Sequence, residues 1–552
     1  MKIPGSPVAY WASERELSCF EKYPAISNFA ISSNGVQTGN NDRYVRGWYE
    51  VSFNKLSVKW FFYNKGGPFR KWYGNYDYVV NWENNGKEIK EEKNSCARGE
   101  EFYFKSGITW SDVTSGNLSC RYLPEGFIFD ASGPSAFFKN NDYTVIGLAL
   151  LNSNFANYWS KILNPTLHFQ SGDFRKITLA PNFTSTEVRD VAEELIKQTK
   201  LDWDECEFSF DFKSNPITEI SEPSTRLAFM QLRESWKKRQ SKVRELEIRN
   251  NKLFIESYEL DEEIKEEVDE ERITLLCNPT YRFGSKYDSE TLENLLRSET
   301  LKDLISYAIG CMMGRYSLDK SGLIFASQGE TIQDYLAQIP SPKFRPDDDA
   351  ILPLTDQEWF ADDVTNRFRE FVKVVWSEDT LQENLDFVAE SLCLHAIKPK
   401  KGETSMETIR RYLSMQFYKD HMKTYKKRPI YWLFSSGKQK AFECLVYLHR
   451  YNEGTLSRMR TEYVTPLMGK YESQIRHIEE QQTSATAAEK TKLGKELKEY
   501  QSKLNELREF DSKLKHYADM LISLDLDDGV KVNYGKFGDL LANVKDITGE
   551  KP

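Results

Sequence analysis

The sequence of 552 residues predicts an α+β protein in three main parts. Residues 35–181 predict an aromatic-rich lobe that contains β-strands, because short aromatic or β-branched runs alternate with glycine and asparagine clusters. Residues 182–455 predict a mixed, mainly helical region. Residues 456–552 predict a C-terminal antiparallel helical segment, like a coiled coil, because leucines recur at intervals of four and three. Residues 1–34 are interpreted as a connector.

The lobe over residues 35–181 is marked by its aromatic content. The stretch from Tyr44 to Trp82 holds 14 aromatic residues. Aromatic side chains favour strands, whereas glycine and asparagine favour the turns between strands. Strands are therefore predicted at four aromatic runs, residues 60–63, 76–82, 102–104 and 127–129.

The pattern becomes helical after Thr184. Apolar residues are spaced at i, i+3, i+4, i+7 and i+8, as expected for one buried face of a helix, at Val188, Val191, Ala192, Leu195 and Ile196. Helical character extends to Tyr258. Proline-containing breaks divide the chain between there and Arg450 into short elements.

The last part of the chain carries an apolar seam with one shortened step. Its members are Leu493, Leu497, Tyr500, Leu504, Leu507, Phe510, Leu514, Tyr517 and Leu521. Two antiparallel helices of one chain, or two chains in a dimer, would bury such a seam. The short connection at residues 483–485 favours the preceding helix as the cover. That helix supplies only Ile475 and Ile478 as strong apolar partners, so Tyr500, Phe510 and Tyr517 are expected to anchor the seam on the body of the protein.

Composition excludes several classes of protein. No run approaches 18 apolar residues, so a membrane-spanning helix is not expected. The eight cysteines are scattered without a CxxC pair, which indicates reduced thiols and a cytoplasmic protein. The formal charge is −9, but residues 1–181 carry +3 and the remainder −12. The lobe is therefore the likelier part to bind a polyanion.

The sequence carries no recognised catalytic motif. The phosphate-binding glycine loops, the serine-hydrolase elbow and the zinc-protease helix are all missing, and the six histidines are spread singly. Asn278, Pro279, Thr280 and Tyr281 approach the Asn-Pro-Pro-Tyr motif of adenine methyltransferases, but Thr280 replaces the second proline. This segment is interpreted as a turn, and no metal site is predicted.

Residues 65–73, with the sequence KGGPFRKWY, combine glycines, cations and aromatic rings. Such a loop can approach a phosphate, neutralise it and stack on bases. The same loop can equally be a hairpin turn whose Trp72 and Tyr73 lie in the core. Both interpretations can hold together.

Longer motifs resemble BREX phage-defence adenine methyltransferases of the PglX type. They are GVQTGNN (35–41), WYEV (48–51), GITWS (107–111), RYLPEGF (121–127), YAIGCMMGRYSLD (307–319) and RPIYW (428–432). LNS (151–153), NPT (164–166) and GDFRKI (172–177) are also similar to specificity subunits of restriction systems. The resemblance covers essentially the whole chain.

The resemblance implies that the chain corresponds to the C-terminal half of such an enzyme. Residues 35–181 would form the target-recognition lobe, and residues 1–34 would connect it to an N-terminal methyltransferase domain. The family's S-adenosylmethionine loop and Asn-Pro-Pro-Tyr motif match nothing here, so no catalytic or cofactor residue is carried over. We expect no cofactor in this chain and S-adenosylmethionine in the complete enzyme. Alone, the chain is expected neither to bind that cofactor nor to methylate DNA.

The implied function is recognition of double-stranded DNA for adenine-N6 methylation. Its partners would be DNA, the methyltransferase domain or subunit, and other BREX proteins. The alternative is a scaffold that docks other BREX components with little DNA affinity of its own. The candidate DNA-binding residues are Arg43, Arg70, Lys71, Arg98, Lys105, Thr109 and Arg121.

Overall fold

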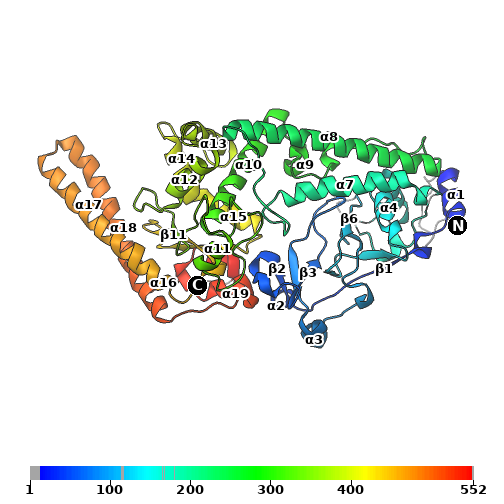
Figure 1. Ribbon diagram of the computed structural model, residues 1–552, viewed down its shortest axis with the longest axis horizontal. Helices are drawn as coiled ribbons and strands as arrows, with labels where there is room; N and C mark the ends of the chain where they lie inside the picture. Colours follow the sequence, from blue (N-terminus) through cyan, green and yellow to red (C-terminus); the bar gives the residue numbers. More distant parts are fainter. Residues whose placement is uncertain (1–12, 114–116, 165, 167, 180, 550–552) are drawn as a thin grey trace. The chain divides into compact units, whose positions relative to one another are not determined.

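The computed structural model describes residues 13–113, 117–164, 166, 168–179 and 181–549 (Figure 1). The chain forms two compact units, each assembled from separate stretches of sequence. The first unit comprises the described residues of Met1–Trp48, Lys55–Phe212 and Met230–Leu296; the second comprises Tyr49–Asn54, Lys213–Phe229 and the described residues of Arg297–Pro552. Helices and strands occur together, which confirms the α+β class.

The four segments predicted from the sequence differ from the two compact units of the structure. Their boundaries do not coincide with 34/35, 181/182 or 455/456, and the functional segments stay a prediction. The first twelve residues of the predicted connector lie outside the described residues.

The strands of the first unit form two four-stranded sheets. One has the order β1-β8-β5-β6 and is antiparallel throughout; the other has the order β2-β4-β3-β7, in which β3 and β7 pair in parallel. The strands are β1 (Ala30–Ser33), β2 (Val45–Gly47), β3 (Trp60–Asn64), β4 (Tyr78–Asn81), β5 (Gly107–Trp110), β6 (Cys120–Leu123), β7 (Phe127–Phe129) and β8 (Ser135–Phe138).

Three of the four strand predictions are confirmed, by β3, β4 and β7. The prediction at residues 102–104 is wrong. There Gly99 has a φ of 67° and precedes a 3-10 turn, Glu100–Phe102, and Phe104 itself has a φ of 67°. A 3-10 turn followed by a left-handed residue does not form a regular strand, so the aromatic rings of this run are placed by packing and not by strand pairing.

The core of the first unit is built from aromatic rings. Tyr63, Val80, Ile128 and Phe129 are fully buried and bring residues of β3, β4 and β7 into one cluster. Trp203, from the end of helix α7 (Thr186–Asp204), joins the same cluster. The strands are short and buried on both faces at β5, β7 and β8, which explains the lack of a simple in–out alternation.

The predicted helix after Thr184 is α7. Ser185 caps it by accepting a hydrogen bond from the backbone N–H of Val188, and Val188, Ala192 and Leu195 are buried. The other helices that begin in the first unit are α1 (Glu14–Lys22), α2 (Asn41–Tyr44), α3 (Glu83–Glu91), α4 (Asp142–Leu151), α5 (Asn154–Leu163), α6 (Ser171–Phe174), α9 (Pro279–Phe283) and α10 (Ser289–Met312). Helix α8 (Thr225–Tyr258) begins in the second unit, and most of it lies in the first.

The second unit contains a three-stranded antiparallel sheet and many helices. The sheet has the order β10-β11-β9, from β9 (Ile351–Pro353), β10 (Tyr431–Ser435) and β11 (Glu443–Tyr447). The helices are α11 (Ile332–Gln338), α12 (Val364–Trp376), α13 (Leu381–His395), α14 (Ser405–Tyr412), α15 (Tyr418–Thr424), α16 (Thr455–Arg458), α17 (Thr465–Ser484), α18 (Ala487–Asp519), α19 (Gly529–Gly535) and α20 (Val544–Thr548).

Helices α17 and α18 form an antiparallel pair, drawn side by side in orange in Figure 1. Thr486 starts α18 with a capping box to Glu489. Leu504, Leu507 and Phe510 of the predicted seam are buried. The pair is anchored to the rest of the second unit near its base, where Tyr471 donates a hydrogen bond of 2.8 Å to the carbonyl of Ala441.

Two of the predicted anchors make ring contacts here. Outside the helix pair, the Tyr500 ring lies 6.3 Å from that of Trp359, and the Phe510 ring lies 6.2 Å from that of Phe442 in the segment before β11. These contacts are consistent with burial of the seam within one chain.

We expect Leu507→Ala to lower the free energy of unfolding by about 2–5 kcal/mol, because a fully buried leucine leaves a cavity. Leu493→Ala, at a half-buried position, is the matched control and should cost about 1 kcal/mol or less. Urea unfolding at two protein concentrations checks both. A midpoint that rises with protein concentration would show that the seam is buried between chains instead.

Candidate nucleic-acid interface

The loop from Lys65 to Gly74 follows β3 and turns into the first unit. Trp72 has a φ of 70° and is fully buried. Gly74 has a φ of 123°, and a Cβ atom there would lie 2.4 Å from Nε of Arg70. Glycine is therefore required at this position. The loop thus folds its cations inward, and Trp72 and Tyr73 belong to the core.

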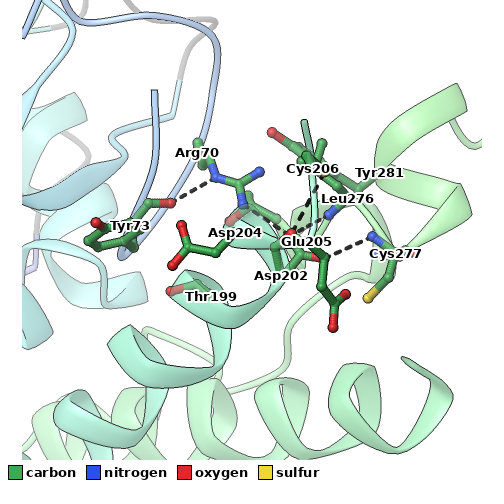
Figure 2. A network of polar contacts seen from close by, with 12 residues as sticks. Arg70, Tyr73, Thr199, Asp202, Asp204, Glu205, Cys206, Leu276, Cys277 and Tyr281 are labelled. Atoms are coloured by element: carbon green, nitrogen blue, oxygen red, sulfur yellow. Dashed lines mark hydrogen bonds and ion pairs between the residues drawn. The ribbon is translucent and has the colours of Figure 1, made fainter. Parts of the chain in front are cut away.

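Arg70 lies in a buried polar network (Figure 2). Its Nη2 donates to Oδ2 of Asp202 at 3.0 Å, and its Nε donates to the carbonyl of Tyr73 at 2.8 Å. The Asp202 carboxylate also accepts from the backbone N–H groups of Leu276 and Cys277, at 2.7 and 2.9 Å. Arg70 and Asp202 are both almost fully buried, so the pair joins the loop to α7 and to the 276–277 segment.

Lys71 makes a second buried ion pair, with Glu247 of α8. The other carboxylate oxygen of Glu247 accepts from the indole N–H of Trp72 at 2.8 Å. The backbone N–H of Lys71 donates to the hydroxyl of Thr274 at 3.0 Å. The Lys71 ammonium, the Lys71 backbone N–H and the Trp72 indole N–H therefore all have partners inside the protein.

Thr109 and Arg121 face each other across β5 and β6, and both are fully buried. The Thr109 hydroxyl accepts from the side chain of Asn64 at 2.6 Å. Arg121 has one long contact, from Nη1 to the carbonyl of Arg70 at 3.5 Å, while its Nε and Nη2 have no hydrogen-bond partner among the described residues. Burial lowers the pKa of Arg121, because desolvation disfavours the charged form.

The candidates therefore fall into two groups. The structure brings Arg70, Thr109 and Arg121 together with Lys71 beside them, but all four are buried, and their assignment as DNA contacts stays a prediction. Arg43, Arg98 and Lys105 are exposed, and within the described part of the chain no contact joins them. Arg43 is partly neutralised by Glu88 of α3 at 3.3 Å and by Glu92, the residue that follows this helix, at 3.6 Å.

Lys105 borders a groove of about 520 Å³ on the first unit. The groove is lined by four phenylalanines, Phe102, Phe104, Phe137 and Phe138. The rings of Phe102 and Phe137 are nearly parallel, with an angle of 8° and a centroid distance of 4.7 Å. The Lys105 ammonium lies 5.7 Å from the centroid of the Phe102 ring.

Sequence reasoning found Lys105 but missed its neighbours in the groove. Lys139, Glu125 and Asn141 also line it, and all three are exposed. These residues lie on separate turns and on the start of α4, so their sequence positions gave no sign of a common site. The available signal is the aromatic run Phe102-Tyr103-Phe104 before Lys105, and its pattern predicts a strand instead.

The Asn278 segment is part of the folded core of the first unit. Asn278 is fully buried and caps α9: its side chain accepts from the N–H of Thr280 at 3.1 Å and donates to the carbonyls of Glu270 and Ile273. All hydrogen-bonding groups of this amide are occupied. The segment is a helix start rather than an open turn, and its amide is not available to a base.

The described residues offer no cluster of metal ligands, and buried thiols such as that of Cys120 have a raised pKa. Within these residues no group of three or more His, Cys, Asp or Glu side chains is placed to hold a metal ion. The eight cysteines are unbridged. Burial raises the pKa of Cys120 and of Cys277, which keeps both thiols protonated.

No helix in the described ranges is long and apolar enough to cross a bilayer.

The chain is similar along its whole length to curated adenine-specific methyltransferases. No family model matches it. It is 48% identical over 561 residues to the adenine-specific methyltransferase BrxX of Escherichia coli O9:H4 (strain HS), and it covers 46% of that protein. It is 37% identical over 564 residues to the adenine-specific methyltransferase PglX of Lacticaseibacillus casei (strain Zhang), of which 44% is covered.

The chain is therefore homologous to part of adenine-specific methyltransferases. Its relatives bear the names BrxX and PglX, in agreement with the PglX-type resemblance of the sequence motifs. The chain spans less than half the length of these curated relatives.

We expect Glu247→Gln to lower the stability of the first unit by about 3–5 kcal/mol, because it leaves the Lys71 charge buried without a counter-charge. Glu245→Gln, on the exposed side of the same helix, is the matched control and should stay within about 0.5 kcal/mol of the parent. Urea unfolding followed by tryptophan fluorescence measures both. Equal stability of the two variants would contradict the role given to this ion pair.

Proposed function

We propose that this chain is the DNA-binding target-recognition portion of a BREX site-specific adenine-N6 DNA methyltransferase. It would act in the cytoplasm in phage defence and in marking self DNA. The support is twofold: the homology covers the chain from end to end, and the first unit carries an aromatic groove bordered by exposed lysines. In this proposal the chain corresponds to the C-terminal half of the relatives. Methyl transfer from S-adenosylmethionine would be carried out by an N-terminal domain or subunit.

The single observation that carries DNA binding is the composition of the groove. Phenylalanine rings offer surfaces on which bases can stack, and Lys105 and Lys139 supply charges that attract phosphates. The Lys139 ammonium donates to the carbonyl of Asn28 at 2.9 Å, which fixes the position of that charge. Arg98 and Arg43 would add phosphate contacts from the same unit. Residues that specify individual base pairs would join them from the exposed loops.

The scaffold alternative has its own supporting observation. The distal part of the α17–α18 pair, around residues 479–499, is mostly exposed although the helices are long. Such an arm could dock another BREX component. Binding to partner proteins without salt-dependent binding to duplex DNA would favour this alternative.

We expect the chain to bind duplex DNA with an affinity that falls with salt. Lys105→Ala should flatten the slope of log affinity against log salt by about 0.9, and Lys105→Ala with Lys139→Ala by about 1.8, because each lost phosphate contact releases one fewer counterion. Lys161→Ala removes one exposed charge on α5, away from the groove-lining residues, and serves as the control. Fluorescence anisotropy with a labelled duplex at several salt concentrations gives the slopes. Identical slopes for the parent and the double variant would remove the groove from the interface.

A further inference from the structure

We propose that the groove beside Lys105 holds a single unstacked DNA base that carries an exocyclic amine: adenine, cytosine or guanine, but not thymine. This inference rests on the proposed function and names the ligand of the same site. The base would stack on the exposed ring of Phe104, and Glu125 and Asn141 would bind its edge. Lys105 and Lys139 would hold the flanking phosphates.

The first argument is the shape and stiffness of the apolar wall. Phe137 and Phe138 are each 6% exposed and are fixed by the core, where the Phe137 ring also packs 5.4 Å from that of Phe129. Phe102 is stacked on Phe137. A wall of packed rings loses little conformational entropy when a flat ligand covers it. A base is such a ligand, because each of its faces is an aromatic surface.

The second argument is the conformation of Phe104. This residue is 39% exposed and has a φ of 67°, a region that favours glycine. Two backbone hydrogen bonds hold it there: its N–H donates to the carbonyl of Phe127 at 2.8 Å, and its carbonyl accepts from the N–H of Gly126 at 3.0 Å. Backbone strain of this kind concentrates at ligand-binding positions. Glycine would suit this backbone better. The Phe104 ring packs 5.5 Å from that of Phe61 and is still 39% exposed, which points to a use for its exposed part.

The third argument is the chemistry of the polar groups. Asn141 begins the turn into α4, and its side chain makes no cap hydrogen bond. Neither Asn141 nor Glu125 has a side-chain hydrogen bond within the described ranges, so both amide and carboxylate are available. An amide can donate to and accept from the same edge of adenine, and a carboxylate accepts from the exocyclic amine of cytosine or adenine. Thymine has no exocyclic amine, and a carboxylate opposes its carbonyl oxygens, which sets the preference against thymine.

The charges around the groove fit one nucleotide strand. Lys105 and Lys139 carry two positive charges against the single negative charge of Glu125. The surplus suits phosphates on either side of an inserted base. A purely apolar peptide segment would gain nothing from the surplus charge.

The test uses the full chain and four labelled duplexes of one sequence. One is fully paired, one carries a single bulged adenine, one a bulged thymine, and one an abasic bulge that keeps the extra phosphate. Anisotropy titrations should show the bulged adenine binding about tenfold more tightly than the abasic bulge, a ratio typical of one stacked base. The bulged thymine should bind less tightly than the bulged adenine.

Phe104→Gly is the decisive variant. It removes the ring and suits the left-handed backbone, so it should fold with an unchanged thermal midpoint and lose the tenfold preference while keeping its affinity for the paired duplex. Tyr287→Ala removes a ring of the same 39% exposure elsewhere in the first unit, and it should keep the preference. Glu125→Gln should bring adenine and thymine bulges to similar affinity, because the neutral amide can also donate to the carbonyl oxygens of thymine.

The possible failures are distinguishable. Equal affinity for adenine and abasic bulges, or a preference that survives Phe104→Gly, would overturn the base site and leave DNA binding intact. Absence of binding to every duplex would overturn the proposed function as well, and would leave the groove to a protein partner.

Discussion

The first unit depends on two buried ion pairs, Arg70 with Asp202 and Lys71 with Glu247. A charge without a partner is costly in a protein interior, so each cation is stable only while its carboxylate is in place. The two carboxylates come from α7 and α8, and the cations come from one loop after β3. The loop therefore ties the aromatic sheets to the two long helices. The same loop and carboxylates position two further segments. Trp72 forms a β-bridge with Arg121 of β6, and Asp202 accepts from the N–H of Cys277 in the segment before α9.

Much of the secondary structure could be predicted from the sequence, because it depends on local patterns. The periodicity of Val188 to Leu195 gave α7, and the aromatic runs gave β3, β4 and β7. The antiparallel pairing of α17 and α18 followed from a leucine seam and a short connection. At residues 102–104 the same reasoning failed, because an aromatic run favours burial of its rings in either a strand or a turn. The left-handed Phe104 is held by bonds to the turn before β7 and to β7 itself, and no local pattern contains that information.

The site was harder to predict than the fold. The loop KGGPFRKWY contains the residue types of a phosphate-binding loop, but Arg70 and Lys71 find their partners 132 and 176 residues further along the chain. A single sequence does not show which carboxylate will meet which cation. The groove illustrates the opposite failure: Lys105, Glu125, Lys139 and Asn141 are unremarkable in the sequence and meet only in space. The contacts within the chain do not indicate which proteins it is related to, and the similarity to two adenine-specific methyltransferases does. That similarity assigns no role to the groove.

The interleaving of the two units bears on how such proteins can evolve. The chain passes from one unit to the other five times, twice within the continuous helices α8 and α10. A modular protein can exchange a specificity domain by recombination at two linkers. Here a replacement of the first unit would need several simultaneous junctions, including breaks inside helices. Under the proposed function, a change of recognition sequence would therefore arise by point changes in exposed loops rather than by cassette exchange.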